Sequence, residues 1–578
     1  MVTFRKVSDL SHRHWPTAIR SPVLWLLLAG AVLRLPGLMW GLPASDGWDS
    51  DGVAPRDFLI GVVKTYRTGD FFTYPPLHLL LLTALTAPGW IVGLIKASSF
   101  AQSDLISEFI KPPYMTFFAV TARLVSIALS LATIVFASKI GQEIGGRRVG
   151  LLVVAICVLN PVLTYYGQTS NLDAPYLFWA MAAMWQWTRV ISRHEIGRVR
   201  WALLLTVAAI ATKDQAYAIF ILSIPLVLAL WFLADAAARE NSREILFNLL
   251  VWSTISLLLL LAVDGALTNP IGFGLRFAFL MGSASQDHAY YARDWHGRIR
   301  LLRDIWDDFA KYYPSVIAYF SLLGFMTHCS RANADRGVWV AGFLPLLAII
   351  SFTATFNFVA LRAESRFVLP QLLFLSIYAA LGVDFLLGLK PVFVRWAVRI
   401  SVSIVAGLAI HQCLAVSAAL RNDPRYDAER WLKDNVAADD HIETYGLNVY
   451  LPRFSAGRVS RVSPLPIENR SPLPGVTEIQ QPLDAIEIRS PRFIVISEAW
   501  ANRYLAPDAS DNSDSRLLSN DQRRQFQETA TRRYFHDLYE QRLRYRLAHS
   551  STYESPFWPR VHLHESLAET VRIFQRVE

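Results

Sequence analysis

Apolar runs of roughly 20 residues recur along the chain from Pro22 to Leu420, separated by short polar or basic segments. A helix needs about 20 apolar residues to cross the ~30 Å hydrocarbon core of a bilayer. The pattern therefore predicts a polytopic α-helical membrane protein. After Leu420 the apolar runs stop, and mixed polar sequence with Pro-rich turns follows. Residues 421–578 are long enough to form one independent domain.

The basic segments orient the predicted spans. Four cations precede the first apolar run, and Lys139–Arg148 is the next basic loop. Because Lys and Arg mark the cytoplasmic side, an even number of crossings lies between these two segments. Three apolar runs lie there, at 22–40, 76–98 and 115–138. We expect 76–98 to lie in the outer interface, since Pro88-Gly89 breaks it into two halves. The alternative is an ordinary second span.

Continuing the alternation predicts 11 spans, with the C-terminal domain on the outer side. The first run carries no small-residue cleavage site and is expected to be retained. Outer-face loops are expected at 41–114 and 268–313, in a membrane domain covering 1–420. The predicted spans are 22–40, 115–138, 149–166, 174–191, 201–212, 215–234, 245–267, 314–328, 338–359, 367–389 and 396–420.

Composition and charge support this division. Hydrophobic residues make up 53% of the chain, and 18 residues are Trp. Residues 421–578 contain 22 Lys and Arg against 23 Asp and Glu, so the net charge of +9 belongs to the membrane half. A basic surplus of this kind is typical of cytoplasmic loops and does not indicate a nucleic-acid partner. The C-terminal domain has no Cys, which excludes a disulfide framework there.

On this topology, charged and polar residues from five segments gather at the outer rim. Ionisable groups near hydrocarbon are costly unless they face water, a partner or a substrate, so the cluster indicates a functional site. The candidate residues are Asp46, Asp49 and Asp51, Tyr74, Asn171 and Asp173, Lys213, His288, Arg293 and His296, and Arg362, Glu364 and Arg366.

Three of these residues also have simpler explanations. Asp173 precedes Ala174-Pro175 and is suited to cap a helix. Lys213 is placed where a lysine can extend to the membrane interface. Arg366 fits an ordinary cation at a membrane boundary. These alternatives concern single residues, whereas the clustering of all of them favours a site.

A cation beside an acid at the outer interface suits one kind of reaction. Lys or Arg neutralises the phosphate of a lipid-linked donor as it leaves, and a carboxylate opposite takes the proton of an incoming hydroxyl. This chemistry transfers a glycosyl group from a polyprenyl-phosphate-linked donor, with inversion. We expect Lys213, Arg366 and Arg362 to bind the phosphate. The base, Asp51 or Asp49, is expected across the sugar from Lys213 and Arg366.

The order of several segments resembles the GT-C membrane glycosyltransferases. The similarity is to the protein-mannosyltransferase-like family (family 39) and its bacterial relatives, which include the lipid A aminoarabinose transferases. It covers essentially the whole chain and implies a GT-C fold, a lipid, glycan or protein acceptor, and a bacterial inner membrane with the site on the periplasmic side. The matching segments are RLPGLMWGLP, DSDG, RTGDFFTYPPLHLLLL, GRRVGLLVVAICVLNPVLTYYGQTSNLDAPYLFWA, ATKDQA and ESRFVLP.

The resemblance also implies roles for residues. Asp51 matches the catalytic acidic residue of the first loop, although Gly52 stands where the family usually has Glu, so Asp49 stays a rival. Asp173 matches the second acidic position, and Lys213 matches a lysine associated with the carrier phosphate. His288 and His296 lie where relatives carry histidines in the long outer loop. No cofactor is required, and a divalent metal is left open.

The C-terminal domain is predicted to be a small α/β domain. Tyr426–Asn435 has helical spacing, and HIETYG, RFIVISE and ETVRIFQ are strand-like. Residues 531–546 are predicted to form a helix rich in Arg and aromatics, with one face solvated or in contact with an acidic or glycan acceptor.

Two alternative functions for the chain are a secondary transporter and a non-catalytic scaffold. Transporters carry ionisable residues near the membrane midplane and show repeats, and this sequence shows neither.

Overall fold

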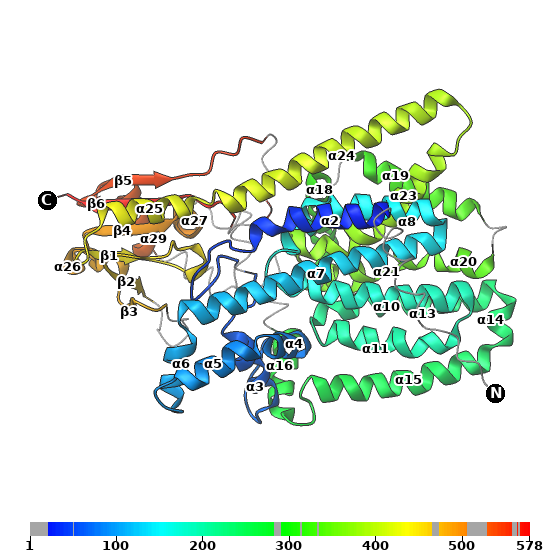
Figure 1. The fold of residues 1–578 in the computed structure, drawn as a ribbon, viewed down its shortest axis with the longest axis horizontal. Helices are drawn as coiled ribbons and strands as arrows, with labels where there is room; N and C mark the ends of the chain where they lie inside the picture. Colours follow the sequence, from blue (N-terminus) through cyan, green and yellow to red (C-terminus); the bar gives the residue numbers. More distant parts are fainter. Residues whose placement is uncertain are drawn as a thin grey trace, which may run out of the picture.

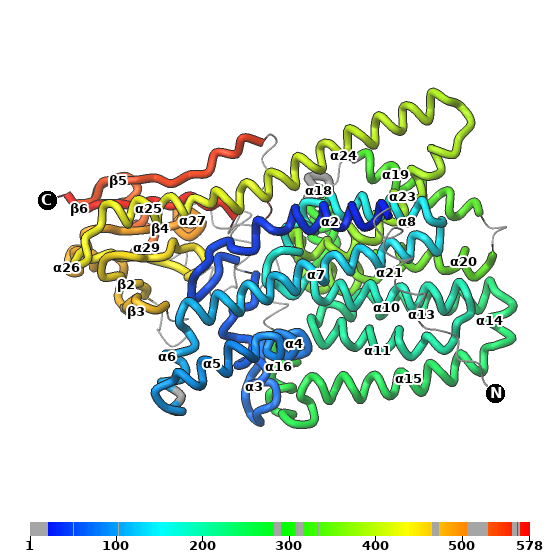
Figure 2. Tube along the Cα trace, in the orientation of Figure 1, coloured from blue at the N-terminus to red at the C-terminus, as the bar shows by residue number. Residues whose placement is uncertain are grey.

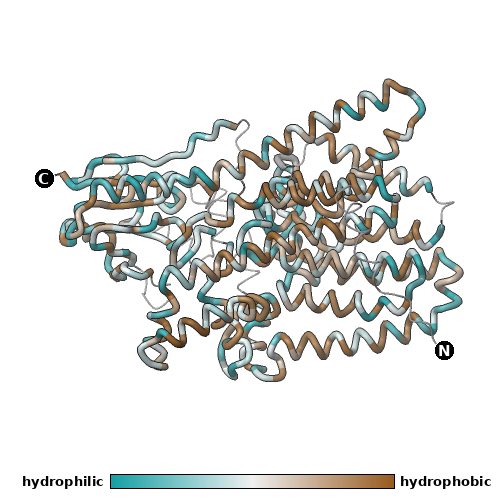
Figure 3. Tube along the Cα trace, viewed as in Figure 1, coloured by the Kyte–Doolittle hydropathy of each residue, from teal (hydrophilic) through white to brown (hydrophobic). Residues whose placement is uncertain are grey.

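The computed structural model describes residues 21–49, 51–282, 291–312, 315–331, 335–464, 473–505, 529–557, 563 and 567–577. A bundle of long helices occupies one end of the molecule, and a domain built on a sheet occupies the other (Figure 1). Hydrophobic residues predominate along the bundle, whereas polar residues gather in the C-terminal domain and at the far end of the bundle (Figure 3). The chain is therefore a polytopic helical membrane protein with a C-terminal α/β domain.

Most helices of the bundle run along the long axis of the molecule (Figure 1). They are α2 (Pro22–Arg34), α7 (Pro112–Gly145), α8 (Arg147–Val158), α10 (Asp173–Arg193), α11 (Val199–Ile210), α13 (Ser223–Ala234), α15 (Ser242–Val263), α19 (Ser315–Ser330), α20 (Arg336–Ala341), α21 (Leu344–Phe352), α23 (Leu369–Leu387) and α24 (Val392–Arg421). Short helical pieces join or interrupt them: η2 (Leu35–Gly37), α9 (Pro161–Tyr166), η3 (Ile196–Arg198), η4 (Asp214–Ala216), α12 (Tyr217–Phe220), α14 (Ala236–Glu240), the π-helical turn η5 (Thr353–Asn357), α22 (Phe358–Ala360) and η6 (Ser365–Val368).

All eleven predicted spans fall on helical runs, but fewer of these are long, continuous and apolar. Of the described helices, six meet that description, or seven if one bent pair counts as a single span. The segment 149–166 is broken between α8 and α9 because Pro161 begins a new helix. The Asn160 side chain caps this helix, accepting a hydrogen bond from Leu163 N at 2.9 Å.

The segment 76–98 is broken into two helices, as its Pro88-Gly89 pair led us to expect. It forms α4 (Leu77–Leu85) and α5 (Ala87–Lys96), which are bent by 61° at the break. In Figure 1, α4 is seen close to end-on, across the direction of the bundle. The Trp90 ring stacks on Phe118, near the start of α7, at a centroid distance of 4.2 Å. The chain therefore enters α7 from the same end at which α2 leaves the bundle.

Four more helices lie in the two predicted outer loops. Loop 41–114 contains α3 (Asp57–Tyr66) and α6 (Gln102–Phe109), and loop 268–313 contains α16 (Pro270–Met281) and α18 (Trp295–Tyr312). These loops are thus largely helical. They cover the end of the bundle that faces the C-terminal domain (Figure 1).

The C-terminal domain is built on a six-stranded mixed sheet in the order β3-β2-β1-β4-β6-β5. The first four strands in this order are mutually parallel. Strand β6 runs antiparallel to β4, and β5 runs antiparallel to β6. The strands are β1 (His441–Thr444), β2 (Arg458–Ser463), β3 (Val476–Gln480), β4 (Phe493–Ser497), β5 (Tyr545–Ser551) and β6 (Val571–Arg576), with short helices η7 (Asn448–Tyr450), η9 (Leu483–Ala485) and α26 (Ile486–Arg489).

Helices cover both faces of this sheet. One face packs against α25 (Pro424–Asn435) through Ala428 and Leu432. The other packs against α27 (Glu498–Leu505) and α29 (Thr529–Tyr539) through Tyr504 and Phe535. Every residue of β4 is buried, as expected for a central strand with both faces covered.

One prediction for this domain was wrong. The segment 531–546 was expected to be a single helix, but α29 ends at Tyr539 and β5 begins at Tyr545. Strand β5 pairs antiparallel with β6, which lies about 25 residues later in the sequence. This non-local pairing overrides the local helical preference of the segment.

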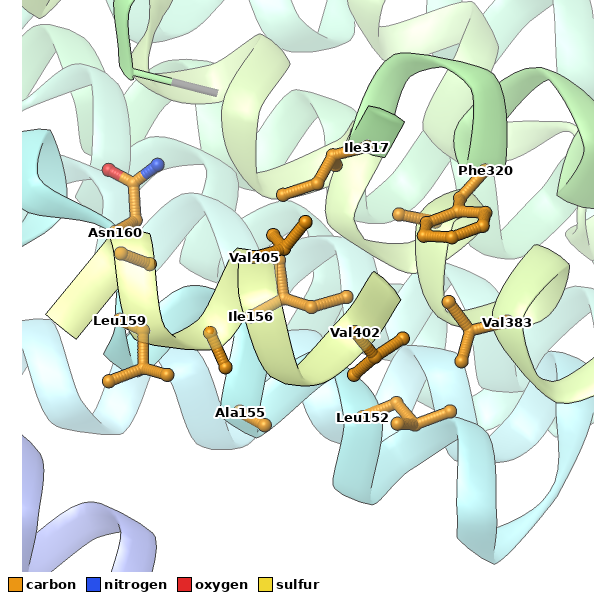
Figure 4. Close-up of a pocket in the computed structure, with 13 residues that line it drawn as sticks. Leu152, Ala155, Ile156, Leu159, Asn160, Ile317, Phe320, Val383, Val402 and Val405 are labelled. Carbon is orange, nitrogen blue, oxygen red and sulfur yellow. The ribbon is translucent and has the colours of Figure 1, made fainter. Parts of the chain in front are cut away.

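An apolar cleft lies between α8, α19, α23 and α24 in the bundle (Figure 4). Its lining includes Ile156, Phe320, Val383 and Val405, with the Asn160 amide at one end. A lining without a charged group does not suit the ionic chemistry predicted for the rim. That chemistry must be sought at the end of the bundle.

A buried junction joins the two domains. The segment after α2 lies between the bundle and the C-terminal domain (Figure 2). It carries Trp40, whose Nε1 donates a hydrogen bond to Asp423 Oδ2 at 2.9 Å. Asp423 also pairs with the fully buried Arg425 at 2.6 Å. The guanidinium carbon of Arg425 lies 4.2 Å from the centroid of the Trp48 ring. An ion pair between two indoles thus holds the first outer loop against the C-terminal domain.

We expect Arg425→Ala to lower the unfolding free energy by about 3–5 kcal/mol, because it leaves the Asp423 carboxylate buried without its partner. Thermal unfolding of the detergent-solubilised protein measures this. The matched control is Arg430→Ala, since Arg430 pairs with Asp427 at 3.0 Å but its side chain is 70% exposed. The control should leave the melting temperature nearly unchanged. Equal melting temperatures for both variants would show that the junction contributes little.

Candidate active site

The first outer loop forms a tight turn at Asp49 and Asp51. Asp51 N donates a hydrogen bond to Asp49 Oδ1 at 3.2 Å, and Gly52 N donates to Asp49 O at 3.1 Å. Asp49 is 6% exposed. A carboxylate that accepts from the backbone two residues on stabilises its own turn. Asp49 therefore shapes the loop that presents Asp51.

The loop is also fastened to the turn between α9 and α10. Val53 N donates to Ser170 O at 3.1 Å. A Cβ atom at Gly52 would lie 2.8 Å from Ser170 Oγ and 3.1 Å from Asp49 Oδ2. A side chain at residue 52 would therefore fit only if the Ser170 hydroxyl or the Asp49 carboxylate shifted.

Asp51 contacts Arg366, a cation from the segment that precedes α23. Its Oδ1 accepts a hydrogen bond from Arg366 Nη1, and Arg366 Nη2 pairs with Glu364 Oε2 at 2.6 Å. Arg366 is delivered by the turn before α23, because the preceding helix ends at Leu361 in a left-handed conformation with φ of 51°. The side chains of Asp51 and Arg366 are 14% and 20% exposed. They are recessed but reachable from the outside.

A second ion pair lies beside the first. Lys213 Nζ donates to Asp173 Oδ1 at 2.7 Å, and Gln215 Nε2 donates to the same oxygen at 3.2 Å. Asp173 is the first residue of α10, the N-cap position is Leu172, and Asn171 Oδ1 accepts a hydrogen bond from Asp173 N at 2.9 Å. The capping explanation of Asp173 was therefore wrong. The explanation of Lys213 as a lysine extending to the interface was also wrong, because its ammonium points inward to a 99% buried carboxylate.

The two pairs belong to one electrostatic cluster. Burial lowers the pKa of Lys213; the Asp173 carboxylate opposes this shift, and the nearby charges of Arg366 and Asp51 also contribute. Burial raises the pKa of the Tyr74 hydroxyl; the charge of Arg366 opposes this shift and that of Asp51 adds to it. Tyr74 is nevertheless 38% exposed. Tyr74 thus lies at the exposed edge of the group formed by Asp51, Arg366, Asp173 and Lys213.

One prediction about this geometry was wrong. The base was expected across the sugar from both Lys213 and Arg366, but Arg366 contacts Asp51 directly. The reason is that Asp51 and Arg366 lie on segments 315 residues apart, and sequence spacing contains no information on which charges meet. Arg362 lies next to this group, with its guanidinium carbon 5.9 Å from the centroid of the Phe367 ring.

Sequence reasoning missed a third ionic group next to Lys213. Arg276 on α16 contacts Asp214, and its Nη1 lies 3.9 Å from Asp264 Oδ2. The Arg276 side chain is only 3% exposed. The sequence carried a signal for it, namely a lone arginine in the apolar helix PIGFGLRFAFLM. A charge in such a helix must find a partner, and Asp214 supplies one.

The other candidates are not part of the cluster. Asp46 pairs with Arg56 at 3.1 Å and accepts from Asn448 Nδ2 at 3.3 Å, so it faces the C-terminal domain. Arg293 and His296 are exposed near the start of α18 and make no hydrogen bond or ion pair to the other described candidates. His288 lies outside the described residues. No three His, Cys, Asp or Glu side chains lie close enough to hold a metal ion within the parts of the chain that the structure describes.

Together these features define a helical membrane protein with a recessed cluster of paired carboxylates and cations at the end of its bundle. No family model and no curated protein sequence matches the chain.

Solved structures of similar overall shape are found. ArnT from Cupriavidus metallidurans in the apo state is 14% identical, with 85% of this chain and 94% of that chain covered and a TM-score of 0.48. The oligosaccharyltransferase AglB from Archaeoglobus fulgidus, in complex with an inhibitory peptide and a dolichol-phosphate, is 11% identical, with 85% and 70% covered and a TM-score of 0.49. ArnT bound to undecaprenyl phosphate gives a TM-score of 0.45 at 14% identity, with 85% and 94% covered. Any assignment of activity to this chain rests on the geometry of its own cluster.

The packing of Gly52 predicts a specific coupling. Gly52→Ala should lower the unfolding free energy by about 1–3 kcal/mol, because the added methyl group overlaps Ser170 Oγ. Ser170→Ala removes that oxygen, so the double variant should regain most of the loss. Thermal unfolding of the single and double variants measures the coupling. Gly274→Ala is the control, since a Cβ at Gly274 meets nothing within 4 Å. Additive effects of the two changes would argue against the close contact.

Proposed function

We propose that the chain is a membrane glycosyltransferase that uses a polyprenyl-phosphate-linked sugar donor. It transfers a hexosyl or pentosyl group to a hydroxyl of a lipid, glycan or protein acceptor on the outer face of the bacterial cytoplasmic membrane. The observation that carries this proposal is the adjacency of the pairs Asp51–Arg366 and Asp173–Lys213 in a recess at the end of an apolar bundle. This location suits a substrate whose phosphate lies at headgroup depth and whose isoprenoid tail lies in hydrocarbon.

Lys213 is the residue suited to the donor phosphate. One of its three N–H groups is directed to Asp173, which leaves two for phosphate oxygens. The phosphate becomes more negative as the bond from the sugar to its oxygen breaks. A fixed ammonium stabilises that charge in the transition state. Asp173 holds the lysine in place, and Gln215 Nε2 in turn donates a hydrogen bond to Asp173 Oδ1.

Asp51 is the residue suited to act as base. The acceptor oxygen attacks the anomeric carbon as the bond to the phosphate oxygen breaks, and Asp51 takes the hydroxyl proton. Direct attack opposite the leaving phosphate inverts the anomeric centre. Arg366 acts as the partner of Asp51 in this proposal, since it contacts the carboxylate and keeps it oriented. Phosphate binding then falls to Lys213, with Arg362 alongside.

The placement of the ionic groups distinguishes this function from transport. Transporters carry ionisable residues near the middle of the membrane, at breaks within spans. Here Asp51, Asp173, Lys213 and Arg366 lie in turns at one end of the bundle. The C-terminal domain lies at the same end and faces the first outer loop (Figure 1). An acceptor can therefore meet the site between loop and domain.

Asp51→Asn should fold and still bind the lipid donor, but transfer sugar at least ~100-fold more slowly, because the amide keeps the shape and loses the basicity. Transfer of radiolabelled sugar from a polyprenyl-phosphate donor in membranes measures turnover, and retention of labelled donor by purified protein measures binding. Asp46→Asn is the control and should remain active. Full activity of Asp51→Asn alongside inactive Asp49→Asn would transfer the role to Asp49. Full activity of both would rule out the proposed base.

Lys213 should set the alkaline limit of activity. Its pKa is lowered by burial, so the ammonium loses its proton at a lower pH than an exposed lysine does. Activity should fall as the pH rises through that value, because only the protonated form neutralises phosphate. In Lys213→Arg, whose guanidinium stays protonated, the alkaline limb of kcat/KM should move to higher pH. Lys213→Ala should lose about 100-fold or more in turnover at every pH. An unchanged alkaline limb in Lys213→Arg would exclude Lys213 as the titrating group.

A further inference from the structure

A second polar pocket lies at the opposite end of the bundle from the candidate active site. It is formed by the last turns of α7 and α10, the start of α8 and the start of α20, which meet at this end (Figure 1). Its volume of about 690 Å³ is within the range of small-ligand sites. Its charged lining consists of the cations Lys139, Arg147, Arg189 and Arg193 and the carboxylates Glu143 and Asp335.

The carboxylates of this pocket are already engaged. Glu143 Oε2 accepts from Arg193 Nη2 at 2.8 Å, and its Oε1 accepts from Ser192 Oγ at 2.9 Å. Asp335 caps α20 by accepting from Val338 N at 3.2 Å. Lys139 and Arg147 form no ion pair with any carboxylate in the described parts of the chain. The pocket therefore has a surplus of positive charge.

The floor of the pocket is an aromatic ring surrounded by cations. Lys139 Nζ lies 4.4 Å from the centroid of the Trp185 ring and 5.2 Å from that of Phe136. The guanidinium carbons of Arg198 and Arg189 lie 5.5 and 5.9 Å from the Trp185 centroid. Arg189 Nη2 and Arg198 Nε both pair with the Glu195 carboxylate, whereas Arg189 Nε is buried without a hydrogen-bond partner. Lys139 is therefore the cation at this ring that has no carboxylate partner among the described residues, and it is available for an added anion.

Lys139 and Trp185 meet some way in from the ends of their helices. Lys139 is six residues before the end of α7 at Gly145, which is about 9 Å along the helix from that end. Trp185 is eight residues before the end of α10 at Arg193, or about 12 Å from it. The contact between them therefore lies about two helical turns from the end of the bundle.

Apolar surface continues from the pocket into the membrane region. Phe136 lies between Trp185 and Phe178, with ring centroids 5.7 and 5.8 Å away. All three rings are partly exposed. They form a track along α7 and α10 that leads from the cations toward the middle of the bundle. Such a track suits an acyl chain attached to a headgroup held by the cations.

We propose that this pocket binds the phosphodiester headgroup of one anionic phospholipid, with an acyl chain along Phe136 and Phe178. Basic pockets between transmembrane helices at a membrane surface bind anionic headgroups in this way. The phosphate lies between Lys139 and Arg147, and Arg189 Nε gains its missing acceptor. The site is separate from the sugar-transfer site and does not depend on it.

The test compares lipids on the purified full chain in a neutral detergent. Dioleoylphosphatidylglycerol is titrated against dioleoylphosphatidylcholine, with the melting temperature and the lipid retained in native mass spectrometry as readouts. We expect phosphatidylglycerol alone to raise the melting temperature and to be retained at one molecule per chain. Lys139→Gln/Arg147→Gln should weaken its apparent affinity about tenfold or more. Arg243→Ala/Lys390→Ala removes the same charge from exposed positions at the same end and should bind normally.

Three outcomes would overturn the proposal. They are equal effects of the two lipids, retention of phosphatidylglycerol by the Lys139→Gln/Arg147→Gln variant, and reproduction of the shift by 10 mM inorganic phosphate alone. The last would identify a site for free phosphate. If the double variant already melts at a lower temperature in phosphatidylcholine, Arg147→Gln alone gives the same comparison, since Arg147 is exposed at the start of α8.

Discussion

Pairing of recessed charges is the constraint on which the outer end of this molecule depends. A carboxylate or cation among packed apolar helices is tolerated when it has a close partner of opposite charge. Asp51 therefore requires Arg366, and Asp173 requires Lys213. Each pair joins segments that are far apart in the sequence. The same contacts that offset the desolvation of these charges also fix the first loop and α10 relative to the turn after α11 and the turn before α23.

The backbone around these pairs is shaped to deliver them. Asp49 accepts two backbone hydrogen bonds and so turns the chain at Asp51. Gly52 allows that turn to press against Ser170, and Asn171 accepts the hydrogen bond of Asp173 N at the start of α10, while the Asp173 side chain pairs with Lys213. Asp49, which the sequence left as a rival of Asp51, thus stabilises the turn that positions Asp51. This division of work supports Asp51 over Asp49 as the proposed base.

The two ends of the bundle have different electrostatic character. At the end that carries the candidate active site, Arg366, Lys213 and Arg276 each have a carboxylate partner, which suits a site where an anionic substrate enters and leaves. At the far end Lys139, beside the Trp185 ring, and Arg147 have no carboxylate partner among the described residues. A surplus of this kind suits a permanently bound anionic lipid. The C-terminal domain is joined to the end of the bundle through Trp40, Trp48, Asp423 and Arg425, so its position is tied to the loop that carries Asp51.

The sequence by itself determined the class of the molecule, the helical runs, the break within 76–98 and most members of the ionic cluster. Those features follow from the length and periodicity of apolar runs and from the cost of charge near hydrocarbon, which act locally. Only the tertiary structure decided that Arg366 contacts Asp51, that Arg276 joins Asp214, and that residues 545–551 form a strand. Each depends on contacts between segments distant in the chain, and local pattern carries no information on which segments meet. The predicted span 149–166 shows both contributions, since Pro161 was visible in the sequence but the break it causes became clear only from the Asn160 cap.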